Sequence, residues 1–274
     1  MHPIFISLGP VTIRWYGVFI ALGFLAAHWL FQKHGRRIEL DSATRSNLIL
    51  LIFLSGILGA RVYYVLLHWQ EYKTESIEIF RIDHGGLVFF GGFLAACITL
   101  WVWAHWKKQA VAPLLDALAA PLALGHALGR MGCFMNGCCH GKPCDYFWAV
   151  RLNSPPEIAG TSVHPVQLYE FFGLLDICLA LLFLEKLRRY PGYVFLSYVV
   201  LYAVLRFTVE FFRGDVPRVL MERFTLAQGI SAGLLLIAWI AMARLTGQFI
   251  RSRKQAALRH ARNHPSQCDS VPKP

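Results

Sequence analysis

Residues 193–213 read YVFLSYVVLYAVLRFTVEFFR, a membrane-spanning length of apolar side chains that contains three charged ones. A helix of about 20 apolar residues crosses the hydrocarbon core of a bilayer. Six other segments have a similar length and hydrophobicity, namely 15–31, 48–67, 86–104, 114–134, 168–184 and 226–243. We therefore predict an all-α, polytopic integral membrane bundle of about seven transmembrane helices, with a single transmembrane domain over residues 1–250.

The composition and the charge distribution agree with this class and predict an orientation. Of the 274 residues, 56% are hydrophobic and 16% are charged, a bias that a soluble globular domain does not need. Lysine and arginine next to helix ends are retained on the cytoplasmic side. One set of connections carries 16 of these residues and the opposite set carries 8, which predicts an outer N-terminus and a cytoplasmic C-terminus. The net charge of +11 then reflects topology and attraction to membrane lipid, with no nucleic-acid partner.

The tail 251–274 is polar and basic, and we expect it to be disordered in the cytoplasm. The longest connection, about 135–167, is rich in Gly, Pro, Cys and His and falls on the outer side. Long connections in compact domains commonly carry function.

Three charged residues in the quoted segment fall on one helical face. Arg206, Glu210 and Arg213 are spaced i, i+4 and i+7, and a charge inside a spanning helix costs at least about 2.5 kcal/mol. One interpretation is an Arg206–Glu210 ion pair that only holds helices together. However, Glu210 can neutralise only one neighbouring arginine, and Arg130 has no acid within one helical turn in the sequence. Unpaired guanidinium groups favour a phosphate ligand, which they bind in bidentate geometry. A further intramembrane arginine, Arg61, is not assigned a role.

The sequence around Arg130 combines small residues with a cysteine-rich loop. Glycines at 125, 129 and 132 allow close approach of a neighbouring helix or of a ligand. Residues 133–144 then contain four of the seven cysteines and His140. We rank three interpretations of this loop: structural disulfides on the oxidising outer side, then a reactive thiol, then a metal site, because the paired Cys-x-x-Cys spacing of zinc sites is missing. No metal or other cofactor is expected.

Several further motifs fall near the same outer face. They are Trp15-Tyr16-Gly17, the glycine-bracketed segment 85–92 and the polar helix start His164-Pro-Val-Gln167-Leu-Tyr-Glu170. Polar groups from several helices that converge in the outer half of a bilayer predict a site open to outer-leaflet lipid.

These motifs, in this order and spacing, resemble the prolipoprotein diacylglyceryl transferase family. The match includes Gly129-Arg130-x-Gly, Asn136-Gly137 and Arg206-Phe-x-x-Glu-Phe-Phe-Arg213 in addition to the three motifs above. The resemblance implies a multi-pass enzyme of the bacterial inner (cytoplasmic) membrane, with its active site towards the periplasmic face. It would transfer diacylglycerol from phosphatidylglycerol to the lipobox cysteine in the signal peptide of a prolipoprotein, the first step of lipoprotein maturation, and release glycerol phosphate.

The resemblance also assigns roles to residues. Arg130 would hold the phospholipid headgroup, while Arg206, Glu210 and Tyr16 would belong to the catalytic site. The remaining substrate-binding candidates are Asn136, Gly137, Arg213, His164 and Gln167.

The chain departs from the family pattern at the expected general base. Well-known members carry a histidine where this sequence has Phe90, and they carry an asparagine and an acid at the positions of Cys133 and Cys138. Candidate replacements for the base are His126, His140 and His164. We favour His126 as a catalytic residue, because it lies one helical turn before Arg130 on the same face. A histidine that is only hydrogen-bonded inside the bundle is the competing interpretation.

Two other functions compete with the transferase. A relative of the family could act on another acceptor, or in thiol or redox chemistry through its cysteine-rich loop. An anion transporter could use Arg61, Arg130 and Arg206 along a path, but it would need polar groups through the full depth of the bilayer. The inner halves of these helices are mostly apolar, which disfavours the transporter.

Overall fold

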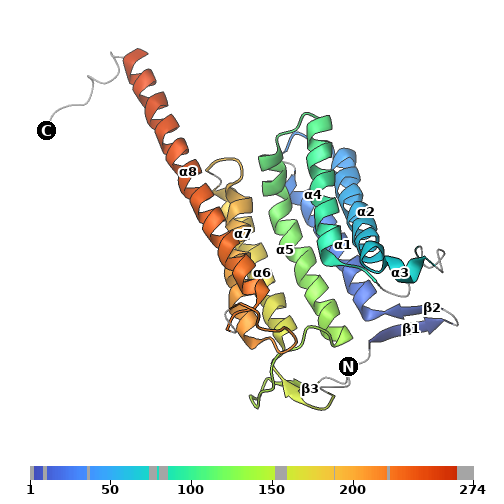
Figure 1. Cartoon of the computed structure of the whole chain (residues 1–274). Coiled ribbons are helices and arrows are strands. Elements are labelled where there is room, and N and C mark those ends of the chain that lie inside the picture. The colour runs from blue at the N-terminus through green and yellow to red at the C-terminus, as the bar shows by residue number, and fades with distance from the viewer. Residues whose placement is uncertain are drawn as a thin grey trace.

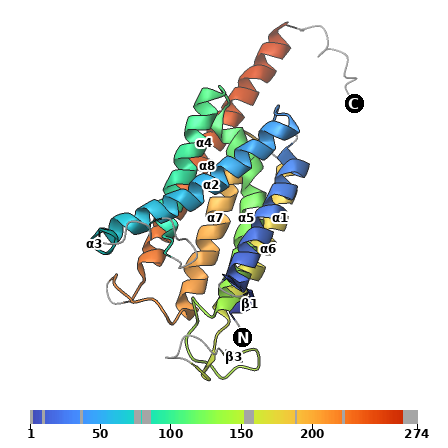
Figure 2. The same ribbon diagram turned by 90° about the vertical axis from the view of Figure 1, so that its right-hand side faces the viewer.

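The computed structural model describes residues 3–8, 11–35, 38–73, 79, 86–151, 159–187, 189–220 and 223–263. Within this part, seven helices are long and apolar enough to cross a membrane, which confirms the predicted number (Figures 1 and 2). They are α1 (Trp15–His34), α2 (Ser42–Leu67), α4 (Phe89–Trp106), α5 (Val111–Asn136), α6 (Val166–Lys186), α7 (Tyr193–Val209) and α8 (Leu226–Asn263). Shorter helices in the described residues include α3 (Trp69–Tyr72) and the 3-10 helix η5 (Glu210–Phe212).

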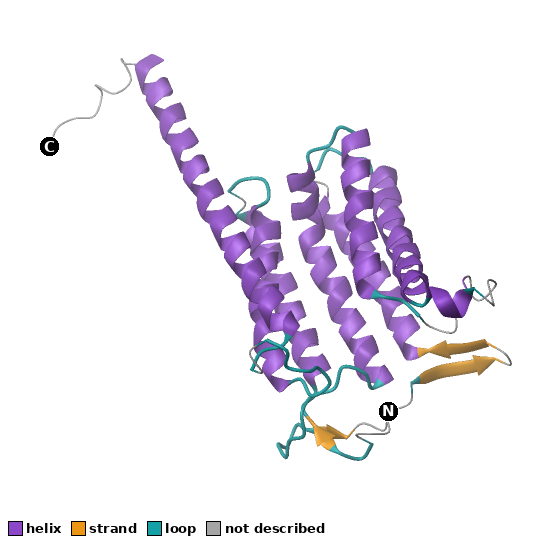
Figure 3. Cartoon of the chain, viewed as in Figure 1, coloured by secondary structure: helices purple, strands orange, loops and turns teal. Residues whose placement is uncertain are grey.

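The described residues also include four short strands, which were not part of the all-α prediction (Figure 3). Strand β1 (Ile4–Leu8) pairs antiparallel with β2 (Val11–Arg14) directly before α1. Strands β3 (Val150–Arg151) and β4 (Ser162–Val163) pair in the long connection between α5 and α6. The first hairpin is rich in β-branched residues, which favour strands, but it is too short to show a clear alternating pattern.

The helices form one bundle with α1 and α5 packed together at its centre (Figure 1). Helices α6, α7 and α8 cover one side of α5, while α2 and α4 pair with each other on the side of α1. The N-terminal hairpin and β3 lie at one end and the C-terminal end of α8 at the other, as an odd number of spans requires. The charge distribution predicts that the end with the hairpin faces outwards.

Glycines bring the backbones of α2 and α4 into direct contact. A Cβ atom added to Gly59 would lie 2.6 Å from the carbonyl oxygen of Gly91, and one added to Gly91 would lie 2.4 Å from that of Gly59. Gly91 belongs to the glycine-bracketed segment predicted to allow close backbone approach, and the residue that approaches is therefore in α2. Gly85 of that segment is outside the described residues.

The glycines of α5 likewise allow α1 to pack closely against it. A Cβ on Gly125 would lie 3.4 Å from the carbonyl oxygen of Gly23, and one on Gly132 would lie 3.3 Å from Cδ2 of Tyr16. The sequence left open whether a helix or a ligand fills this groove, and α1 occupies it. Tyr16 is thereby positioned at the C-terminal end of α5.

Helix α7 starts on a carboxylate that belongs to another helix. Asp116 of α5 is buried, and its two oxygens accept hydrogen bonds from the backbone N–H groups of Gly192 and Phe195, at 2.8 and 2.9 Å. These are donors that the first turn of a helix cannot satisfy internally. The contact therefore caps α7 and fixes it to α5.

Helix α8 continues to Asn263, which differs from the disorder expected from Arg251 onwards. The sequence RSRKQAALRHARN is polar but consists largely of good helix formers, so a long spanning helix can extend through it. Residues 264–274 lie outside the described part.

Candidate active site

A buried carboxylate joins two arginines from different helices at the end of the bundle that carries the hairpins. Glu170 of α6 has only 1% of its side chain exposed. Its Oε2 lies 2.7 Å from Nε of Arg130 on α5, and its Oε1 accepts a hydrogen bond of 2.8 Å from Nη1 of Arg206 on α7. Three central helices therefore meet at one ionic centre.

A second set of charges continues the centre beyond the end of α7. Nη2 of Arg206 lies 2.9 Å from Oε2 of Glu210, which is fully buried, and the other oxygen of Glu210 accepts a 2.9 Å hydrogen bond from Thr225. Arg213 lies 3.9 Å from Glu210 and makes two hydrogen bonds, of 2.9 and 2.8 Å, to Asp215. The predicted shared face of Arg206, Glu210 and Arg213 is confirmed, although the helix tightens to 3-10 form at Glu210.

The prediction of unpaired guanidinium groups is wrong. Arg130, Arg206 and Arg213 are balanced by Glu170, Glu210 and Asp215, and the pairs that involve Glu170 span 36 to 40 residues of sequence, so spacing within one helix could not reveal them. Buried charges need such partners, because an uncompensated one is costly.

The ion pairs with Glu170 still leave N–H donors of Arg130 and Arg206 available for a ligand. Nε of Arg130 is buried and makes no hydrogen bond within the described residues, so its contact with Glu170 is an ion pair without hydrogen-bond geometry. The side chains of Arg130 and Arg206 keep 13% and 16% of their surface exposed. Each guanidinium group has five N–H donors, so both can bind an anion while Glu170 holds their orientation.

Tyr16 and His126 lie on opposite sides of Arg130 along α5. Tyr16 belongs to α1 and packs against Gly132 near the C-terminal end of α5, with 40% of its surface exposed. His126 lies one helical turn further in, and its ring meets that of Tyr202 edge-on at a centroid separation of 5.2 Å. Their catalytic roles stay predictions.

The residues from Asn136 to Lys142 form a loop that three elements hold in place. Gly137 ends α5 with a left-handed φ of 76°, which glycine adopts without strain. The side chain of Gln167 on α6, which is fully buried, donates a 2.7 Å hydrogen bond to the carbonyl oxygen of Cys138. Beyond α7, Gly214 donates its N–H to the carbonyl oxygen of His140 at 3.1 Å. Gln167 therefore positions the loop, and the substrate-binding roles of Asn136, Gly137 and Gln167 stay predictions.

His164 belongs to an aromatic cluster at the same end. Its Nδ1 lies 3.1 Å from the hydroxyl of Tyr169, which accepts a 2.8 Å hydrogen bond from Nε1 of Trp148. The ring of Phe212 meets that of His164 at 5.2 Å. The cluster joins the start of α6 to η5, and a role of His164 in substrate binding stays a prediction.

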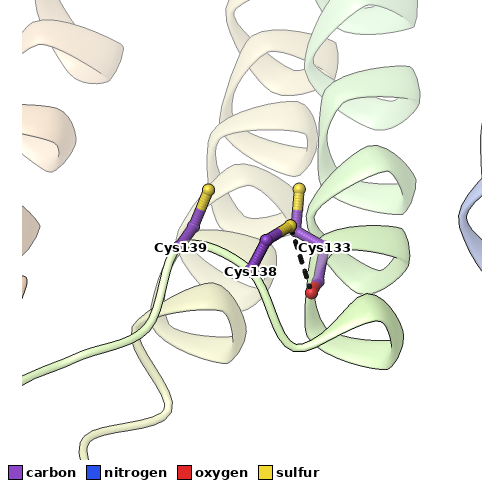
Figure 4. Close-up of side chains that lie close together, drawn as sticks. All are labelled: Cys133, Cys138 and Cys139. Carbon is purple, nitrogen blue, oxygen red and sulfur yellow. Dashed lines mark hydrogen bonds between the residues drawn. The ribbon is translucent and has the colours of Figure 1, made fainter. Parts of the chain in front are cut away.

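The cysteines of the loop are free thiols, in contrast to the disulfides ranked first from the sequence. Cys133, Cys138 and Cys139 come together, with their sulfur atoms within 4.8 Å of one another (Figure 4), and could hold a metal ion. The neighbouring thiols of Cys133 and Cys138, together with the guanidinium groups of Arg213 and Arg130, lower the pKa of the Cys139 thiol. Cys139 also has a left-handed φ of 60°, which is uncommon for a residue other than glycine.

Two residues singled out in the sequence lie away from this centre. Phe90, at the position of the family histidine, is 62% exposed on α4, which packs against α2. Arg61 donates hydrogen bonds to the carbonyl oxygens of Ile79 and Gly86 and lies over the rings of Tyr64 and Tyr72. Arg61 therefore anchors the connection between α2 and α4.

Sequence reasoning quoted Glu170 within a motif but did not place it in the site. The available signal was an acid within the first turns of a spanning helix, which needs a cationic partner as much as an intramembrane arginine does. Asp215 gave no such signal, because it lies in a polar connection where an acid is ordinary.

Membrane-length helices around a buried arginine–carboxylate centre define a polytopic membrane protein with a polar site at one end of its bundle. The family model of prolipoprotein diacylglyceryl transferase matches residues 3–244, so the chain belongs to this family of transferases.

Curated relatives agree over most of the chain. A protein of Bacillus licheniformis is 35% identical over 259 residues, which are 92% of this chain and 96% of the relative. One of Bacillus cytotoxicus is 34% identical and covers 89% of this chain and 92% of the relative. One of Clostridium botulinum (strain Langeland) is 33% identical, and the match covers 78% of this chain and 86% of the relative. All three are named phosphatidylglycerol–prolipoprotein diacylglyceryl transferase.

Proposed function

We propose that this chain transfers the diacylglyceryl group of phosphatidylglycerol to the thiol of the lipobox cysteine in a prolipoprotein signal peptide. The observation that carries the proposal is the ionic centre of Arg130, Glu170, Arg206 and Glu210, built from α5, α6, α7 and η5 in a chain of this family. The enzyme lies in the inner membrane, with this centre towards the periplasmic face.

The reaction needs positive charge where this centre provides it. The acceptor sulfur attacks the glycerol carbon, the carbon–oxygen bond to the phosphate breaks, and glycerol phosphate leaves with the electron pair of that bond. Negative charge increases on the phosphate as the bond breaks, so donors aimed at it stabilise the transition state more than the ground state. Arg130 binds the headgroup phosphate, and Arg206 contributes the second guanidinium group.

The carboxylates have a positioning role in this scheme. Glu170 contacts both arginines, and Glu210 holds Arg206 from the other side while bonded to Thr225. Each guanidinium plane is therefore set before the lipid arrives, which lowers the reorganisation that catalysis requires. Arg213 is paired with Asp215 beyond the end of α7, and its remaining N–H donors can contact an anionic headgroup.

The acceptor thiol must lose its proton, because a free cysteine with a pKa near 8.5 is only a few per cent thiolate at neutral pH. Phe90 cannot accept that proton, and His126 is the base proposed from the sequence. Replacing His126 by Gln and measuring the pH dependence of transfer tests this role. An unchanged rate at every pH would remove His126 from the mechanism.

The test of the function uses purified protein, labelled phosphatidylglycerol and a lipobox peptide, with detection of a thioether-linked product. Arg130→Ala should abolish transfer while the variant remains folded in detergent. Arg218→Ala is the matched control, because Arg218 is exposed and outside the centre. Normal turnover by Arg130→Ala would refute the headgroup assignment, and absence of product from the wild-type protein would refute the transferase itself.

A further inference from the structure

Three thiols beside the arginine centre form a set of metal-ligand type that the reaction above does not use. Cys133 lies on the last turns of α5, and Cys138 and Cys139 lie in the loop that follows. All three are partly buried free thiols, and their sulfur atoms lie within 4.8 Å of one another. Figure 4 shows the side chains converging from helix and loop with the sulfur atoms grouped together.

The backbone holds these thiols in place before any ligand binds. The N–H of Cys138 donates a 3.2 Å hydrogen bond to the carbonyl oxygen of Cys133, which links loop to helix. Gln167 fixes the carbonyl oxygen of Cys138 from α6, and the segment after α7 fixes that of His140. Cys139 is kept in a left-handed conformation between these anchors, a strain that persists only where the surroundings enforce it.

The spacing of the sulfur atoms suits a tetrahedral ion of the size of zinc. With Zn–S bonds of about 2.3 Å, tetrahedral angles place two sulfur ligands about 3.8 Å apart. The observed upper limit is 4.8 Å, so a contraction of about 1 Å or less completes the triangle. Side-chain rotation alone covers such a distance.

The number and charge of the ligands point to a catalytic rather than a structural site. Three protein ligands leave a fourth position open, as in catalytic zinc sites, whereas structural sites have four. Zn²⁺ with three thiolates has a net charge of −1, and Arg213 and Arg130 lie close enough to Cys139 to interact with it electrostatically. A soft thiolate set also disfavours Mg²⁺ and Ca²⁺, which prefer oxygen.

We infer that Cys133, Cys138 and Cys139 bind a zinc ion, and that its open position binds the thiol of the acceptor cysteine. This inference rests on the proposed transferase function. A thiol that coordinates zinc is deprotonated, so the ion supplies the thiolate that Phe90 cannot help to generate.

The step balances without a redox partner. On coordination the thiol proton passes to solvent. A lone pair of the zinc-bound sulfur then forms the S–C bond to the glycerol carbon, and the C–O bond breaks with its electron pair moving to the phosphate oxygen. The product sulfur is a neutral thioether, a weak zinc ligand, so it leaves the ion and frees the position for the next acceptor.

Metal binding is tested first, without reference to activity. The full chain in detergent is stripped with a chelator, loaded with Zn²⁺ or Co²⁺, dialysed and assayed for bound metal and for cobalt–thiolate absorption. We expect one ion per chain, lost in Cys133→Ser, Cys138→Ser and Cys139→Ser and retained in the matched controls Cys97→Ser and Cys144→Ser. Retention in all three of the first set, or disulfides among these cysteines in protein alkylated during isolation, would overturn the inference.

The open position is tested with the acceptor peptide. A lipobox peptide should change the cobalt absorption spectrum, and the same peptide with serine in place of its cysteine should not. His140→Ala should keep the ion; its loss would make His140 a fourth ligand and overturn the open position.

Transfer activity separates this inference from the function on which it rests. Chelation should reduce transfer at least about 100-fold, and Zn²⁺ should restore it. If the stripped protein transfers at the full rate, the transferase stands and the zinc role is wrong. If the metal-loaded wild type binds the peptide thiol but forms no thioether, the ion site stands and the proposed function fails.

Discussion

Replacing Glu170 by Gln tests whether the ionic centre is a single unit. The substitution keeps the shape of the side chain but removes the negative charge that lies 2.7 and 2.8 Å from atoms of Arg130 and Arg206. Arg130, Arg206 and Arg213 are then left with only Glu210 and Asp215 as partners. The guanidinium groups of Arg130 and Arg206 repel each other on either side of the neutral amide. We expect both stability and transfer to fall.

The magnitude follows from opposing terms. With about 4 Å between charge centres and an effective dielectric constant of about 20, each lost attraction is worth about 4 kcal/mol. The neutral amide of Gln does not carry the desolvation cost of a buried carboxylate, which offsets several kcal/mol of this loss. Removing one partner of a buried ion pair typically costs about 3–5 kcal/mol in total. For a chain of this length the midpoint of thermal unfolding should fall by about 6–20 °C.

The assay is thermal unfolding in detergent, followed by size-exclusion chromatography of the heated samples. Asp176→Asn is the matched control, because Asp176 is exposed on the same helix. A carboxylate in the middle of a spanning helix costs about 2.5 kcal/mol or more where it faces lipid, so this variant should unfold at the same or a higher temperature. Transfer by Glu170→Gln, measured well below its unfolding temperature, should drop about 100-fold because both arginines lose their orientation.

The double variant Arg130→Gln/Glu170→Gln identifies the interaction itself. It should be less destabilised than the sum of the single variants by up to about 3 kcal/mol, because the second substitution removes a charge that the first left unpaired. If Glu170→Gln unfolds within 2 °C of the wild type, roughly 1 kcal/mol or less, the pairing is not structural. Additive single variants would mean that the two residues act independently.

Three further predictions concern stability and binding. Gly59→Ala should destabilise the protein by about 1–3 kcal/mol, because its Cβ would meet the backbone of Gly91 at 2.6 Å; Gly17→Ala, in a helix and with open space around it, should unfold at the same or a slightly higher temperature. Asp116→Ala should cost about 1–2 kcal/mol by leaving the first turn of α7 uncapped, and unfolding as stable as the wild type would show that water replaces the cap. Arg130→Lys should bind phosphatidylglycerol more weakly than the wild type in an equilibrium assay, since an ammonium group cannot form the bidentate contact. Equal affinity would show that the site recognises the phosphate through its charge alone.

The number and positions of the spanning helices could be predicted because each is a continuous apolar run. That signal is local, and the bilayer imposes a minimum length on it. The pairing of the arginines could not be predicted in the same way. Glu170 and Arg206 are neighbours in space only because α6 packs against α7, and a contact across 36 residues leaves no trace in helical spacing.

The cysteine loop shows a second limit of sequence reasoning. Spacing disfavoured a metal site, because Cys133 and Cys138 are five residues apart rather than three. The structure brings them together by ending α5 at Gly137 and turning the chain back, which a left-handed glycine allows. The same turn places Cys139 beside them, so a ligand set can form without a standard motif.

The length of α8 has a practical consequence for experiments on the intact enzyme. At 1.5 Å per residue its 38 residues measure about 57 Å, whereas the hydrocarbon core is about 30 Å thick. Even with a tilt of about 20°, more than 20 Å of helix must extend beyond the hydrocarbon core, through the headgroup layer and into water. A fluorophore or fusion partner attached at Asn263 would therefore be carried clear of the headgroups on a stiff helical spacer.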